Sequence, residues 1–218
     1  MYRQTNSMRN QFYCEREQLR GKIEMIKKYL TLNHNFLLQS KIEYQKTLDN
    51  CKNIYELFIA EDDSIPEFAD FEQIYLNGCL MYLISQYEYY IKEVYKKMCT
   101  QTKTEISPFY GDVVENCKNQ IKELSNIKLF KCVECTFDSI YDIIKLRNQL
   151  VHTDGKSKKY KKETIKHLEK HSNKLRIIKQ QDGRIDVYVS YKYIEYVCNI
   201  VLYSFFSLTK SVHKKLSH

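Results

Sequence analysis

The residues best suited to chemistry in this chain lie between Arg147 and His152, in the run Arg-Asn-Gln-Leu-Val-His. The guanidinium of arginine is a permanent cation whose flat fork of donors suits phosphate oxygens. Histidine can exchange protons near neutral pH. A lysine-rich stretch follows at once and begins with Lys156, Lys158 and Lys159. Together these residues could cleave a phosphodiester without a metal, and the basic stretch would hold a polyanion.

The spacing of these residues decides whether they can act together. Asn148 and His152 are four positions apart, so on a helix they lie on one face. Arg147 and His152 are five apart, and one regular helix does not direct both side chains at a common point. Either the helix ends near His152 and the histidine swings round, or two copies of the helix meet across a dimer. The second arrangement builds one composite site and predicts that dimerisation is required for function.

The elements that must position this segment are predicted to be mainly α-helical. The chain of 218 residues has only five glycines and two prolines, and 43% of it is hydrophobic, which indicates long helices around a core. The widest apolar stripe runs from Phe68 to Met98, so we expect a central buried helix there. Phe71, Ile74 and Val151 are among the apolar side chains expected to face inward. Further helices are predicted at about 112–124, 132–151, 163–171 and 191–208.

Two regions are expected to depart from this series of single helices. Residues 1–60 show helical spacing that the cluster Asn33-His34-Asn35 could interrupt. This region is therefore predicted to be an antiparallel helical hairpin or one broken long helix, packed on the same domain. Further along, Asp182-Gly183 between two β-branched runs predicts a β-hairpin, the only β structure expected.

Charge and composition limit the expected partners and compartment. The formal net charge of +8 favours anionic partners. The polar N-terminus lacks the apolar segment of a signal peptide, and no stretch is long and apolar enough to span a bilayer. We therefore expect a cytoplasmic protein with no membrane association. Its eight cysteines are then expected to be reduced thiols.

The segment Arg147–His152 resembles the R-x4-6-H signature of HEPN domains, including the polar Asn148 directly after the arginine. Gly155, shortly after the histidine, is similar to the glycine of many members. The predicted helix around Tyr82–Ile91, which carries the acidic Glu88, resembles the pairing helix of that family. A β-hairpin followed by a C-terminal helix occurs in some HEPN subfamilies linked to toxins and phage defence.

This resemblance implies an all-α, HEPN-like helical bundle over residues 67–218, with residues 1–60 as a helical extension. The bundle would homodimerise and, as in many members, act as an endoribonuclease that uses no metal and no cofactor. His152 would serve as general acid or base, Arg147 would stabilise charge on the phosphorane-like transition state, and Asn148 would orient the histidine or a phosphate oxygen.

The same resemblance implies the substrate, the products and the biological partners. The RNA would be held near Glu88, Lys156, Lys158 and Lys159, and its cleavage would leave a cyclic phosphate and a 5′-hydroxyl. A toxin or defence effector of this type would be controlled by an antitoxin or another protein of a defence system.

Other interpretations of the same residues stay open. Some HEPN domains keep the fold but act as scaffolds or as modules that bind RNA or protein. Arg147 could then pair with an acidic residue such as Glu88 or Asp142, and His152 could stabilise a helix C-terminus. A nucleotide-binding regulatory domain is a third, weaker alternative.

Two other pairs of side chains could bind a metal. Cys132 and Cys135 form a C-x-x-C pair, but it lies on a predicted helix and no second pair follows to complete a zinc site. His167 and His171 share a helix face. The lysines beside them favour a solvated pair over a metal site. We therefore expect no metal at either place.

Overall fold

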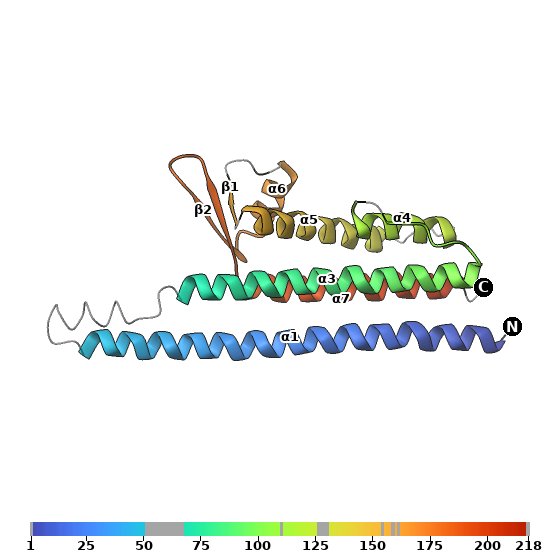
Figure 1. Cartoon of the computed structure of the whole chain (residues 1–218), viewed down its shortest axis with the longest axis horizontal. Helices are drawn as coiled ribbons and strands as arrows, with labels where there is room; N and C mark the ends of the chain where they lie inside the picture. Colours follow the sequence, from blue (N-terminus) through green and yellow to red (C-terminus); the bar gives the residue numbers. More distant parts are fainter. Residues whose placement is uncertain are drawn as a thin grey trace.

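The structure is a computed structural model, and it describes residues 2–50, 68–109, 111–125, 131–153, 155–157, 160 and 162–216. It is mainly helical, as the sequence predicts, with a small antiparallel sheet before the last helix (Figure 1). In chain order the elements are α1 (Tyr2–Asn50), α3 (Phe68–Thr102), α4 (Val113–Ser125), α5 (Lys131–Thr153), β1 (Lys156–Ser157), α6 (Lys162–Lys170), β2 (Leu175–Lys179), β3 (Ile185–Val189) and α7 (Tyr191–Leu216).

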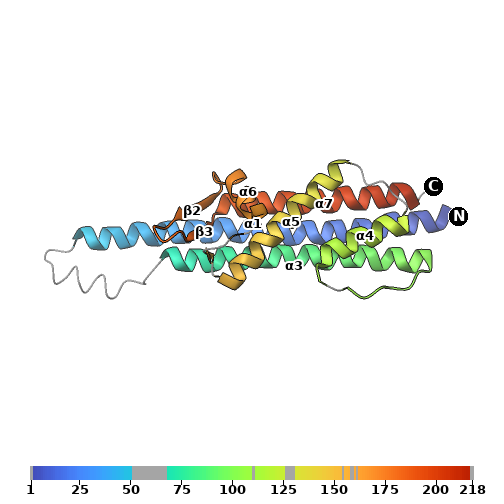
Figure 2. The same cartoon turned by 90° about the horizontal axis from the view of Figure 1, so that it is seen from above.

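The α3 helix is the central element, which confirms the prediction from its wide apolar stripe. It packs against α1, α4, α5 and α7. Seen from the side, α3 and α7 form a middle layer, with α1 below and α4, α5, α6 and the sheet above (Figure 1). Seen from above, α5 crosses obliquely over α3 and α7 (Figure 2). The buried side chains of α3 include Leu80, Leu83, Ile84, Tyr87, Ile91 and Val94.

The α1 helix runs without a break from Tyr2 to Asn50, so the interruption expected at Asn33-His34-Asn35 is absent. The side chains of His34 and Asn35 are exposed, and polar residues at exposed helix positions cost little. The opposite face buries an apolar stripe against α3 and α7, which places α1 on the same core as the rest of the chain. The part of the predicted hairpin at residues 51–60 lies outside the described residues.

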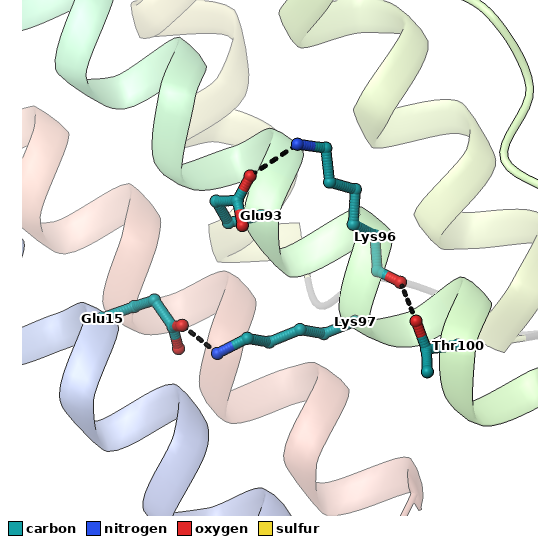
Figure 3. A network of polar contacts seen from close by, with 5 residues as sticks. All are labelled: Glu15, Glu93, Lys96, Lys97 and Thr100. Carbon is teal, nitrogen blue, oxygen red and sulfur yellow. Dashed lines mark hydrogen bonds and ion pairs between the residues drawn. The ribbon is translucent and has the colours of Figure 1, made fainter.

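Charged side chains tie the N-terminal half of α1 to α3 (Figure 3). Lys97 of α3 reaches across to the carboxylate of Glu15, which is mostly buried and therefore needs a partner. Within α3, the Nζ of the preceding Lys96 lies 2.7 Å from Glu93, and the Lys96 carbonyl accepts a hydrogen bond from Thr100 Oγ1 at 3.0 Å. The Glu15–Lys97 pair thus adds a polar contact to the α1–α3 seam at this end.

The turn between α3 and α4 is encoded locally. Lys103 follows the last helical turn of α3 with φ of 54°, and the amide of Thr104 donates to the carbonyl of Cys99 at 3.0 Å. Asp112 then caps α4, because its Oδ1 accepts from the amide of Glu115 at 3.0 Å. These two ends reverse the chain and lay α4 along α3.

The β-hairpin predicted from Asp182-Gly183 is confirmed. Strands β2 and β3 pair antiparallel from Leu175 opposite Val189 to Lys179 opposite Ile185, and Gly183 has the positive φ of 79° that such a turn requires. The hairpin is not the only β structure, however. Strand β1 pairs with the free edge of β3 and gives the strand order β1-β3-β2.

Gly155 fastens the end of α5 to this sheet. Its carbonyl accepts hydrogen bonds from the amide of Val187 at 2.9 Å and from the hydroxyl of Tyr160 at 2.8 Å. Its φ is +75°, and a Cβ placed there would lie 2.6 Å from the Val187 carbonyl oxygen and 3.2 Å from a methyl of Leu150. Only glycine fits both the backbone angle and this close approach.

The expectation that Phe71, Ile74 and Val151 face inward is wrong. These side chains are 54%, 71% and 52% exposed. They lie on the N-terminal half of α3 and at the end of α5, where none of the described elements covers them. None of the helices in the described ranges combines the length and apolarity needed to cross a membrane.

Replacing Gly155 with alanine should destabilise the fold by about 2 kcal/mol or more, because the left-handed conformation alone costs about 1–2 kcal/mol and the new Cβ would clash with Val187. Urea unfolding followed by circular dichroism would measure this loss. Gly183→Ala is the matched control: Gly183 has a φ of +79° with open space around it, so only the conformational part is lost. Equal losses in the two variants would contradict the close packing at Gly155.

Candidate active site

Arg147 pairs with Glu88 across the crossing of α5 and α3. Its Nη2 donates to Oε1 of Glu88 at 2.7 Å. The two side chains are 22% and 26% exposed, so the pair is half-buried and only partly screened by water. The alternative in which Arg147 pairs with an acidic residue therefore occurs, and its partner is Glu88. Glu88, predicted to lie at the bound RNA, is held by the arginine within the same chain.

The local sequence explains why Arg147 takes this position. Leu146 and Leu150, its neighbours on α5, are buried against the core. Arg147 lies at the flank of that apolar face, and its side chain is half-buried. The Nε atom is buried and has no hydrogen-bond partner among the described residues. The carboxylate of Glu88 therefore orients one end of the guanidinium.

Arg147 also lines a hollow of about 260 Å³ between α3 and α5. Most of the wall is apolar, and it comes from both helices. The other lining residues are Ile74, Asn77, Leu80, Met81, Leu150 and Val151. A cation in such a wall is a suitable contact for one anionic group of a larger ligand, because the apolar surroundings weaken competition from water.

His152 and Asn148 lie on a different face of the helix from Arg147. Both side chains are exposed, and α5 stays helical through Thr153. The histidine therefore does not swing round at a helix end, and one chain does not bring the imidazole to the guanidinium. His152 lies in the last turn of α5, where it also suits the negative end of the helix dipole.

The basic residues predicted to bind RNA are only partly described. Lys156 belongs to β1 and pairs with Asp186 in the sheet register, so its backbone leads directly away from the end of α5. The side chain of Lys156, and all of Lys158 and Lys159, lie outside the described residues. Their proposed contact with RNA stays a prediction.

The expectation that His167 and His171 form a solvated pair is wrong. The two residues are only 3% and 4% exposed. Their rings lie on the inner side of α6 and its C-terminal end, with centroids 4.5 Å apart. His167 Nε2 shares a hydrogen bond with the hydroxyl of Tyr193 at 2.8 Å, and its Nδ1 lies 3.7 Å from Asp142. The ring of His171 packs on Tyr196 at 4.5 Å between centroids. These histidines belong to the core.

The sequence contained a signal for this buried cluster. Thr164, His167, Leu168 and His171 follow the i, i+3, i+4, i+7 spacing of a helix face, and all four are buried. The lysines between them occupy the solvent side. Judging the segment by its charge rather than by its periodicity led to the wrong prediction.

Neither pair considered for metal binding forms a complete site within the described residues. Cys135 is exposed on α5, and the side chain of Cys132 lies outside the description. Across the described part of the chain, no three or more histidine, cysteine, aspartate or glutamate side chains are grouped so that they could hold a metal ion.

A double-mutant cycle on Glu88→Gln and Arg147→Met should give a coupling of about 1–2 kcal/mol, between the values for exposed and for fully buried ion pairs. Each single variant leaves one charge half-buried without its partner, whereas the double variant leaves none. The free energy of unfolding in urea, measured for all four proteins, provides the test. Strictly additive effects would show that the two side chains do not interact in solution.

Burial lowers the pKa of His167 to about 3 and that of His171 to about 4, helped by the positive charges of Lys170 and Lys174. In the unfolded chain both return to about 6.5. Below that pH the unfolded state binds more protons, so the free energy of unfolding should fall as the pH drops from 6.5 toward 4. The limiting slope is about 1.4 kcal/mol per pH unit for each histidine.

His171→Phe should remove about half of this slope and change stability little at pH 8, because neither ring nitrogen has a hydrogen-bond partner among the described residues. Urea unfolding at several pH values would show it. A slope that stays the same in His171→Phe would contradict a buried neutral imidazole.

Comparison with known proteins found no match to this chain among protein-family models, curated proteins or solved structures. The likeness to HEPN domains therefore rests on the residues from Arg147 to Gly155, on the helix that carries Glu88 and on the hairpin before the last helix. It stays a prediction about family membership and activity.

Proposed function

We propose that this protein is a metal-independent endoribonuclease of HEPN type that acts as a toxin or defence effector. The observation that carries the proposal is the arrangement at the end of α5. A half-buried arginine is oriented by Glu88 beside a hollow, and an exposed histidine follows on the same helix. These are the two kinds of group that phosphodiester cleavage without a metal requires.

The helix geometry supports a proposed site that two chains share. Because α5 is regular through Thr153, Arg147 and His152 of one chain point in different directions. Two copies that meet near the ends of α5 would supply both groups to one RNA strand. Dimerisation is thus a requirement of this proposal, and a separate antitoxin or defence-system protein would control the activity.

In the proposed reaction His152 removes the proton of a ribose 2′-hydroxyl, whose oxygen then attacks the adjacent phosphorus. The bond from phosphorus to the 5′-oxygen breaks, and a protonated histidine returns a proton to that oxygen. Arg147 stabilises the charge that develops on the phosphoryl oxygens, and Asn148 orients the histidine or the phosphate. The products are a 2′,3′-cyclic phosphate and a 5′-hydroxyl.

A second candidate function is a catalytically silent module that binds RNA or protein. The ion pair itself favours it, because a guanidinium engaged by Glu88 has fewer donors left for phosphate. In this alternative Arg147 stabilises the crossing of α3 and α5, and His152 stabilises the end of α5. A cleavage assay separates the two candidates, whereas an RNA-binding assay does not, because either could bind RNA.

The purified protein should cleave single-stranded RNA in the presence of a chelator, and His152→Ala should lower the rate by about 10²–10⁴-fold, the usual worth of a general acid or base. Arg147→Ala should lower it by about 10²–10³-fold. Gel analysis of a labelled RNA would give the rates, and an RNA with a single 2′-deoxyribose at the cut site should resist cleavage there.

Two controls keep this experiment interpretable. His34→Ala removes an exposed histidine of α1 and should leave cleavage unchanged. Arg147→Lys retains the positive charge beside Glu88, so folding can be checked separately from the loss of the guanidinium fork. Equal cleavage by the wild type and by His152→Ala would reject the nuclease assignment and leave the binding module.

A further inference from the structure

The α1 helix carries a second apolar stripe that the fold of one chain does not use. Met25, Tyr29, Leu32 and Phe36 follow a 4-3-4 spacing, which places them in one line along a helix. Between 43% and 63% of each residue is exposed. The buried stripe of α1 lies about a third of a turn away, with Ile26 and Leu30 among its members.

The two flanks of α1 differ in how they are closed. On the side toward α7, Arg16 donates to the hydroxyl of Thr209 at 2.6 Å, and the guanidiniums of Arg16 and Arg20 lie over the ring of Phe206. On the side toward α3, the seam beyond the Glu15–Lys97 pair opens into two hollows of about 430 and 340 Å³ that share Met25. On the α3 side the uncovered apolar surface borders these hollows and continues onto α3.

The α3 helix continues this uncovered surface. Its exposed large apolar side chains are Phe71, Ile74, Met81, Tyr82 and Tyr89. Gly21 of α1 and Gly78 of α3 line the hollows and have open space where a side chain would begin, so another helix could approach closely. Ile74 and Met81 also line the hollow of Arg147, which makes one edge from α1 to the end of α5.

We propose that this edge is the contact between two copies of the chain, with the two α1 helices packed antiparallel along the Met25–Phe36 stripe. In this arrangement a two-fold axis passes the α1 pair at the level of Leu30 and Thr31. Met25 then faces Phe36 of the second copy, and Tyr29 faces its Leu32. The same register sets Lys28 opposite Asn33 and Lys22 opposite Gln39, so neither of these lysines faces a like charge on the second α1.

The available area suits a stable dimer. Because a large aromatic side chain buries about 150–250 Å² when fully covered, the four residues of the α1 stripe and the five of α3 offer roughly 900 Å² per copy. A standard interface needs about 800 Å² from each partner. The pairing does not depend on the nuclease proposal.

Sedimentation velocity or light scattering between about 5 and 100 µM should show a dimer for the wild type and a monomer for Leu32→Glu/Phe36→Glu. The matched control is Leu38→Glu/Ile42→Glu, which changes two similarly exposed apolar residues on a different face of the same helix and should stay dimeric. Circular dichroism and urea unfolding would confirm that both variants remain folded.

The register has its own test. Met25→Glu and Phe36→Lys should each weaken the dimer, and the two together should restore it, because antiparallel packing sets each glutamate against a lysine of the other copy. A wild type that stays monomeric at 100 µM would overturn the proposal and point to a different protein on this face. A dimer that survives Leu32→Glu/Phe36→Glu would overturn it as well.

The outcome is independent of the proposed activity. A dimer that is broken by the stripe variants but cleaves no RNA would leave the pairing in place and reject the nuclease. Cleavage that persists in a monomeric stripe variant would show instead that the two chemical groups do not need a second chain.

Discussion

The burial of α3 is the constraint on which the other elements depend. This helix is too apolar to be covered from one side, and α1, α4, α5 and α7 each take a part of its circumference. One of these contacts is a buried hydrogen bond between α3 and α7, in which the hydroxyl oxygens of Tyr87 and Ser204 lie 2.7 Å apart. The helix thus sets both the layer order and the direction from which α5 must cross.

That crossing explains the geometry of the candidate site. Because α5 lies obliquely over α3, its last turns reach the edge of the bundle, where Arg147 meets Glu88 and His152 faces solvent (Figure 2). Gly155 then ties the chain after α5 to the sheet, because its carbonyl accepts from the amide of Val187 and a Cβ would not fit there. An arginine paired with Glu88, an exposed imidazole and a glycine that is hydrogen-bonded to the sheet are the features that link the fold to the proposed chemistry.

The two seams that α1 forms, one with α7 and one with α3, are covered by different side chains. Where α1 meets α7, long cationic side chains lie over an aromatic ring and a hydroxyl and shield the seam. Where α1 meets α3, Lys22 also lies over the rings of Tyr89 and Tyr90, but the seam around the two hollows carries tyrosines, Met25 and helical glycines. The proposed pairing of two copies would offset the cost of leaving a continuous apolar band of this size to water.

Much of the architecture could be predicted from the sequence alone, because helical periodicity and local capping act within a few residues. The extents of α3, α4, α5 and α6, the hairpin at Asp182-Gly183 and the central place of α3 all come from such local signals. The same signals located Arg147, Asn148 and His152 on one helix.

Only the tertiary structure decided which faces are covered, since burial depends on elements that lie far apart in the chain. The tertiary structure pairs Arg147 with Glu88, 59 positions away in the sequence, and adds β1 to the edge of the hairpin. It also buries the side chains of His167 and His171 on the inner side of α6. It also left Ile74 and Val151 at the surface, although their apolar character predicted the opposite. Periodicity identifies an apolar stripe, but the packing of the whole chain determines whether that stripe meets its own core or remains available to a second molecule.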